Sequence, residues 1–169
     1  MFIGLETISN KALKFLNKTF NKVAEYKKVI KVLHKFGIAV IASMMFGTDG
    51  ETTGIFKRTV NFLDDIKVDA AIFAVLTPLP GTDLFEKFKK ENRIVTYDWS
   101  KYDALHVVYE PKNMTKDELL EGVKQTYREF YSPKRVLRRI FRTVKTCPFM
   151  IPVNIGYMIG VRKGLVPDW

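Results

Sequence analysis

The chain has 169 residues, of which 47% are hydrophobic, and this composition predicts a folded domain of ordinary size and argues against intrinsic disorder. Lys and Arg number 28 against 18 Asp and Glu, a net charge of +10 that suits an anionic partner and equally suits simple solubility. The single cysteine, Cys147, excludes an internal disulfide and a multi-cysteine metal site, and the lack of a signal peptide or a ~20-residue apolar run predicts a cytoplasmic protein.

The first 112 residues alternate between apolar runs and amphipathic stretches. Ser9 is a typical N-cap, and Gly37 ends a helical pattern in the way glycine commonly does. Two runs are continuously apolar, which predicts strands covered on both faces. We expect strands at 2–5, 38–46, 70–76 and 105–109, and helices at 10–17, 21–36, 52–66 and 83–91.

The remaining residues, 113–169, are predicted to be helical and basic. Thr115 and Glu118 have the spacing of a capping box, and Pro133 interrupts the long helix that follows them. The apolar stretch 148–161 is expected to be broken, because it contains Pro152, Asn154 and Gly156. Between these parts lies a basic cluster of Lys134, Arg135, Arg138, Arg139, Arg142 and Lys145.

The order of elements indicates the fold class. Strands that alternate with helices predict a parallel sheet with right-handed crossovers. A closed eight-stranded barrel takes ~200 residues or more, and only about four strands are expected here. We therefore predict an α/β fold, a partial (β/α) barrel with parallel strands over 1–112, followed by a helical extension over 113–169.

Polar side chains stand where the predicted strands end, which is where ligands bind in such sheets. The Glu6 carboxylate can accept hydrogen bonds from the two vicinal hydroxyls of a ribose, or it can favour the helix start that follows. Ser43, inside an apolar run, either contacts a ligand or bonds a neighbouring carbonyl. Lys18, at the end of the first helix, either stabilises that helix end or holds a ligand carboxylate.

The loop after the third predicted strand is rigid. Pro78 and Pro80 fix the backbone and Gly81 permits a turn, so Thr77 to Gly81 either shape a pocket or only connect two elements. The glycines Gly47 and Gly50 follow the second strand, but the Gly-Lys-Ser/Thr ending of a phosphate-binding loop is missing.

In their order and spacing, several segments resemble the second half of a radical S-adenosylmethionine (SAM) domain, in the group that carries an N-terminal cobalamin-binding domain. They are Phe2-Ile3-Gly4-Leu5-Glu6-Thr7, Leu13–Lys18, Gly37-Ile38, Ser43–Gly47, Leu76–Thr82, Trp99–Asp103, Pro111–Thr115 and Tyr127–Tyr131.

The resemblance implies roles for individual residues. Residues 1–112 would be the C-terminal half of the radical SAM barrel, within an enzyme that cleaves SAM reductively with a [4Fe–4S] cluster, in some members for cobalamin-dependent methylation. The substrate would be a small or lipid-like molecule. Glu6 would contact the SAM ribose, Lys18 the methionine carboxylate, Ser43 the ribose or methionyl part, and Val75 and Leu76 the adenine, while Thr77, Pro78, Pro80 and Gly81 would border the substrate cavity.

The chain departs from the family pattern at one decisive point. The Cys-x₃-Cys-x₂-Cys motif that holds the cluster is absent, Cys147 cannot replace it, and the cobalamin-binding domain is absent as well. We therefore expect the chain to be inactive alone and to need an upstream half, from the same or a separate chain, docked against its unpaired first strand.

The alternative hypothesis is a non-catalytic half-barrel that binds an anionic membrane surface or a protein partner. Its basic tail would present Arg138, Arg139 and Arg142, and the segment Phe149–Ile151 would dip into lipid. Nucleic acid is the least favoured partner, because only the net charge supports it.

Overall fold

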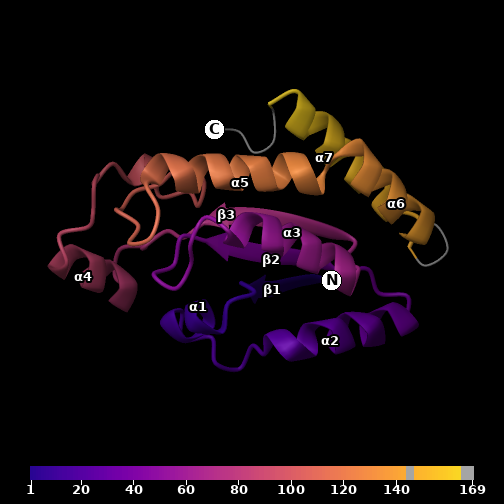
Figure 1. Cartoon of the computed structure of the whole chain (residues 1–169), viewed down its shortest axis with the longest axis horizontal. Helices are drawn as coiled ribbons and strands as arrows, with labels where there is room; N and C mark the ends of the chain where they lie inside the picture. The colour runs from indigo at the N-terminus through magenta and orange to yellow at the C-terminus, as the bar shows by residue number, and fades with distance from the viewer. Residues whose placement is uncertain (144–146, 165–169) are drawn as a thin grey trace.

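The computed structural model describes residues 1–143 and 147–164, and it forms one unclosed parallel sheet followed by three helices (Figure 1). The strands lie in the order β1-β2-β3, which confirms the predicted partial barrel with a helical extension. The predicted Lys145 and residues 165–169 lie outside the described residues. The elements are β1 (Phe2–Glu6), α1 (Asn10–Phe15), α2 (Val23–Lys35), β2 (Ile41–Phe46), α3 (Ile55–Ile66), β3 (Ala70–Val75), α4 (Asp83–Lys90), the 3₁₀ turn η1 (Trp99–Lys101), α5 (Lys116–Phe130), α6 (Pro133–Thr143) and α7 (Met150–Arg162).

Local sequence explains several of the element ends. The Ser9 side chain accepts a hydrogen bond from the Ala12 amide at the start of α1. Thr115 and Glu118 form the predicted capping box at the start of α5, with both hydrogen bonds made. A new helix begins at Pro133, where proline is tolerated because the first helical amide needs no partner.

The sheet is fully covered on one face only. Along β2 the side chains of Ala42, Met44 and Phe46 are buried, whereas Ile41, Ser43 and Met45 are half-buried. The prediction that this run is covered on both faces was wrong. An apolar run does not distinguish a covered face from the inner face of a barrel, because both carry apolar residues. The half-buried face is called the open face below.

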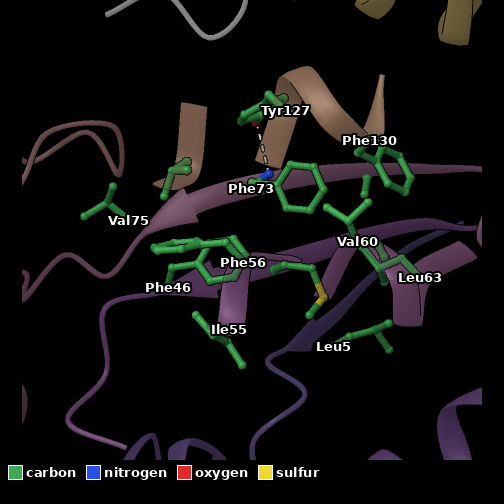
Figure 2. Packing of buried hydrophobic residues seen from close by; sticks show 14 of the residues in the cluster. Leu5, Phe46, Ile55, Phe56, Val60, Leu63, Phe73, Val75, Tyr127 and Phe130 are labelled. Carbon is green, nitrogen blue, oxygen red and sulfur yellow. Dashed lines mark hydrogen bonds between the residues drawn. The ribbon is translucent and has the colours of Figure 1, made fainter. Parts of the chain in front are cut away.

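Aromatic rings fill the covered face (Figure 2). The Phe73 ring lies 4.9 Å from Tyr127 and 5.4 Å from Phe130, both on α5, in edge-to-face geometry. Such pairs contribute about 0.5–1.5 kcal/mol each beyond their buried area. Gly122 lets α5 approach α3, because a Cβ there would lie 2.1 Å from the Phe56 ring.

Hydrogen bonds occupy the outer edge of β3. The Tyr131 hydroxyl accepts from the Ala71 amide and donates to the Ala71 carbonyl, and the Tyr127 hydroxyl accepts from the Phe73 amide. The Val75 amide donates to the Ala104 carbonyl. These three amides are therefore unavailable to a further strand at this edge.

Two sequence predictions in the second half are corrected. Residues 105–109 form no strand of the sheet, since Tyr109 makes a single antiparallel bridge to Ile94 and Ala104 takes the β3 edge. The stretch 148–161 is not broken, because α7 runs through it. Pro152 falls in the first turn, where its missing amide costs little, and Asn154 points inward to the Asp69 carbonyl.

The helical extension closes the amino end of the sheet, and this changes the predicted basic tail. Arg139 is 1% exposed and donates to the Phe130 carbonyl and to Asn154, while Arg142 donates to the Val68 carbonyl. Met150 is buried beside Ala70. Arg139 and Met150 are therefore internal, and Arg142 is half-buried with its guanidinium bonded to the backbone, so the prediction that these three side chains face a membrane was wrong.

Candidate functional site

Glu6 stands at the carboxyl end of β1 in a strained backbone position. Its φ is +66°, and the pairing with β2 shifts register between Gly4 and Glu6. The carboxylate folds back over Gly4, since a Cβ on Gly4 would lie 2.8 Å from Glu6 Oε1. Gly4 pairs with Ser43, and paired residues of parallel strands share a face, so the Glu6 carboxylate lies over the open face near Ser43.

Lys18 approaches the same carboxylate from the loop after α1. Its Nζ lies 3.5 Å from Glu6 Oε1, and the side chains of Lys18 and Glu6 are 42% and 15% exposed. The structure therefore brings together Glu6, Lys18 and Ser43, which were singled out separately in the sequence. The Ser43 hydroxyl has no hydrogen-bond partner among the described residues, so it is free to bond a ligand.

The backbone beneath Glu6 is fixed by the side chains of Asn21, just before α2, and Tyr26, on α2. Asn21 donates from Nδ2 to the Gly4 carbonyl at 3.1 Å, and the Tyr26 hydroxyl donates to the Leu5 carbonyl at 2.7 Å. Burial and the nearby Glu6 carboxylate raise the pKa of Tyr26 to about 12. The hydroxyl therefore stays protonated and remains a donor at neutral pH.

A buried carboxylate, Glu51, joins the ends of β1 and β2. It is 2% exposed, and it accepts hydrogen bonds from the Thr7 hydroxyl at 2.6 Å and from the amides of Gly47 and Thr48 at 3.0 and 3.1 Å. Burial raises its pKa. Sequence analysis missed this residue and noted only the neighbouring glycines. An acid directly after the glycine-containing turn that follows β2 was the available indication.

The same loop is held from its other side by an arginine. Arg93 binds both carboxylate oxygens of Asp49, at 2.7 and 3.1 Å. Although burial opposes it, Arg93 lowers the pKa of Asp49, and this carboxyl stays ionised. The Tyr109 hydroxyl donates to the Gly47 carbonyl at 2.5 Å. The loop 47–51 is thus fixed between β1 and the segment that follows α4.

The remaining predicted residues lie at the end of β3. Val75 and Leu76 are 0% and 2% exposed, and Val75 belongs to the core on the covered face (Figure 2). Their side chains are therefore closed to a ligand, and their amides already donate to the Ala104 and Phe46 carbonyls. Thr77 donates to the Val75 carbonyl, and Gly81 has a φ of +81°, as its predicted turn requires. Pro78 is buried, whereas Pro80 and Gly81 are exposed.

No metal-binding cluster is present in the part of the chain that the structure describes, where no three His, Cys, Asp or Glu side chains converge. Cys147 is 8% exposed and packs against Ala39, Ala70 and Met150. An iron–sulfur cluster takes several thiolates, so it does not fit the residues of this chain. Within residues 1–143 and 147–164, no helix has both the length and the apolar character needed to cross a bilayer.

Comparison with known proteins gives several matches. Residues 82–152 match a domain of unknown function, DUF4070. The chain is 35% identical over 140 residues to the bacteriochlorophyllide d C-12(1)-methyltransferase of Chlorobaculum tepidum, which covers 83% of the chain and 30% of that protein. It is 32% identical over 140 residues to the anaerobic magnesium-protoporphyrin IX monomethyl ester cyclase of Cereibacter sphaeroides, covering 83% of the chain and 22% of that protein.

A third relative is more distant. The hopanoid C-2 methylase of Rhodopseudomonas palustris is 24% identical over 141 residues, which is 82% of the chain and 25% of that protein. The chain spans less than a third of the length of each of these relatives.

Proposed function

Since the chain belongs to the cobalamin-binding group of the radical SAM superfamily, we propose that it supplies part of the SAM- and substrate-binding face of such an enzyme. The observation that carries this proposal is the pairing of Glu6 with Lys18, 3.5 Å apart, at the carboxyl end of β1. Both side chains adjoin the open face of the sheet, next to the Ser43 hydroxyl, which has no hydrogen-bond partner in the described part of the chain.

The chemistry of these three side chains matches the polar parts of SAM. The Glu6 carboxylate is an acceptor for the two ribose hydroxyls, and its low exposure strengthens such bonds. The Lys18 ammonium has three donors, so it can keep its contact with Glu6 and bind the methionine carboxylate as well. Ser43 adds a hydroxyl toward the ribose or methionyl part. When bound, SAM supplies an activated carbon–sulfur bond.

The adenine and the substrate are assigned to the neighbouring strand end. The adenine would lie against the end of β3 at Val75 and Leu76, without contact to their buried side chains or to their amides, which donate to the Ala104 and Phe46 carbonyls. The exposed part of the loop, Pro80 and Gly81, would border the substrate. The relatives named above act on bacteriochlorophyllide, magnesium-protoporphyrin and hopanoid. We therefore assign a large, mostly apolar ring compound as the substrate class, with methylation or ring closure as the reaction.

The [4Fe–4S] cluster and any cobalamin belong to a different part of the enzyme in this proposal. The chain has one cysteine, which is buried, so the thiolates that hold the cluster would come from a segment outside these 169 residues. That segment would lie against β1, because the outer edge of β3 is occupied by Tyr127, Tyr131 and Ala104. The chain by itself would then not cleave SAM.

SAM affinity of the complex between this chain and its upstream segment tests the proposal. Glu6→Gln and Lys18→Met are each expected to weaken SAM binding about tenfold or more, because each removes a charge-assisted hydrogen bond. The matched control is the exposed ion pair Lys22–Glu25 on α2, where Glu25→Gln should leave the affinity unchanged. Unchanged SAM affinity in both site variants would reject the assignment of Glu6 and Lys18.

A further inference from the structure

Helix α6 carries exposed apolar side chains on its outward side, where a helix on a soluble surface usually carries polar ones. Leu137 is 55% exposed and Phe141 is 72% exposed. They are four positions apart and so lie on one side of the helix, together with the exposed cations Lys134 and Arg138. These four residues are called the outer stripe of α6, and the helix lies at the margin of the molecule (Figure 1).

The opposite side of α6 explains why the stripe faces outward. Val136, Arg139 and Thr143 are buried against the rest of the protein. On one flank Arg135 is held by Asp64 and Glu129, and on the other Arg142 is held by the Val68 carbonyl. The orientation of the helix is therefore fixed by its inner arginines, and the outer stripe cannot turn inward to bury Leu137 and Phe141.

The charge of the helix selects the kind of partner. Within Pro133–Thr143 there are five basic residues and no acidic one. Neither Lys134 nor Arg138 has an acidic partner among the described residues. Cations that flank large apolar side chains are typical of a helix that lies in the interface of an anionic membrane. Phe149, 63% exposed just before α7, adds a further aromatic ring to the same helical hairpin.

We propose that the outer stripe of α6 docks the protein onto an anionic lipid surface, with Leu137 and Phe141 inserted and Lys134 and Arg138 against the headgroups. The proposal is independent of the SAM site, because it requires neither SAM nor the upstream segment. Of the three arginines expected from the sequence to face a membrane, it keeps Arg138, and Lys134 takes the place of Arg139 and Arg142.

Helix α2 is an internal comparison for this proposal. It also presents exposed lysines, Lys28 and Lys31, and two exposed valines, Val29 and Val32, which are 44% and 45% exposed. Its apolar side chains are smaller, and it contains Glu25. If the net charge alone draws the chain to a membrane, substitutions on α2 and on α6 will have the same effect.

Co-sedimentation of the full chain with vesicles tests the proposal. With equal parts phosphatidylcholine and phosphatidylglycerol the chain should pellet, and with pure phosphatidylcholine it should not. The double substitution Lys134→Gln/Arg138→Gln should weaken binding roughly 25-fold, at about fivefold per cation. Leu137→Ser/Phe141→Ser should weaken it at least about tenfold, because the inserted apolar area is lost. The matched pairs Lys28→Gln/Lys31→Gln and Val29→Ser/Val32→Ser should change it less than about twofold.

Equal losses from the α2 and α6 pairs, or equal binding to both kinds of vesicle, would overturn the proposal. The proposal would also fail if the chain did not bind vesicles but did bind a single-stranded oligonucleotide, and if Lys134→Gln/Arg138→Gln abolished that oligonucleotide binding. All four substituted residues of the outer stripe are exposed, so circular dichroism and the unfolding midpoint should be unchanged in the variants.

Discussion

The carboxylate of Glu51 accepts a 2.6 Å hydrogen bond from the hydroxyl of Thr7, a residue 44 positions earlier in the chain. Thr7 directly follows Glu6, and Glu51 also accepts the amides of Gly47 and Thr48. The ends of β1 and β2 are thus joined through one buried side chain. The position of Glu6 over the open face depends on this link as well as on its own strand.

Two replacements of Glu51, by Ala and by Gln, separate what its hydrogen bonds contribute to stability from what its charge contributes. In Glu51→Ala two buried amides and the Thr7 hydroxyl lose their acceptor, and we expect a loss of about 2–4 kcal/mol in the free energy of unfolding. Glu51→Gln can keep its oxygen toward the two amides and donate its NH₂ to Thr7, so it should cost less than about 1 kcal/mol. Urea unfolding of both variants checks this. Equal losses would show that the amide acceptor is not what the loop needs.

The pH dependence of stability should also depend on Glu51. Burial raises its pKa above the ordinary value of 4.5, so the folded state favours the protonated form. The stabilisation from this group is therefore complete below pH 4.5 and is lost as the pH rises through the raised value. Between mildly acidic and neutral pH, the wild type should lose stability relative to Glu51→Gln, which does not ionise. Unfolding free energies of both proteins at several pH values measure the difference, and parallel curves would contradict the prediction.

The tyrosines at the edge of β3 give a third prediction. Tyr131→Phe removes both hydrogen bonds to Ala71, and it should destabilise the fold by about 1–3 kcal/mol, since buried backbone groups lose their partner. Hydrogen exchange at the Ala71 amide should quicken. Tyr97→Phe is the control, because Tyr97 is 55% exposed and its hydroxyl has no hydrogen-bond partner in the described residues. Unchanged exchange at Ala71 in Tyr131→Phe would mean that the edge is protected by packing instead.

Truncation of two adjacent arginines on α6, Arg138 and Arg139, should change the stability of the fold by very different amounts. Arg139 is 1% exposed, its guanidinium lies 3.7 Å from the centroid of the Phe130 ring, and burial lowers its pKa to about 10. Arg139→Ala should cost about 3 kcal/mol, from a cavity and from unpaired groups on Phe130 and Asn154. The exposed Arg138→Ala should change stability by less than about 0.5 kcal/mol. Thermal unfolding of the two variants compares them, and similar midpoints would contradict the inward orientation of Arg139.

The sequence predicted what local chemistry determines. The caps at Ser9 and Thr115, the break at Pro133 and the parallel order of the three strands follow from residue types and periodicity. The direction in which each arginine of α6 points could not be predicted, because a basic side chain turns inward only where other elements supply hydrogen-bond acceptors. Here those acceptors are the carbonyls of Phe130, for Arg139, and of Val68, for Arg142.

The candidate site was predicted only in part for the same reason. Glu6, Lys18 and Ser43 could each be named from their place at an element end, but their proximity depends on the register of β1 against β2. Glu51 was missed because its role depends on Thr7, which is distant in sequence. The expected strand at 105–109 failed because the tyrosines of α5 and Ala104 occupy the edge where a fourth strand would pair.

Gly4 gives the most direct test of how the fold holds Glu6. A Cβ at this position would lie 2.8 Å from Glu6 Oε1, so Gly4→Ala must displace the carboxylate from the place where Lys18 meets it. The atom displaced is the end of a flexible side chain, and the unfolding free energy should change by less than about 1 kcal/mol. If Glu6 binds the SAM ribose from its present position, SAM affinity of the assembled enzyme should fall several-fold without loss of stability. Gly54→Ala is the matched control, because a Cβ there meets nothing within 4 Å. Equal SAM affinity in the two variants would mean that Glu6 binds no ligand from this position. If the Gly4→Ala protein does not fold, Gly4 is needed for the strand itself.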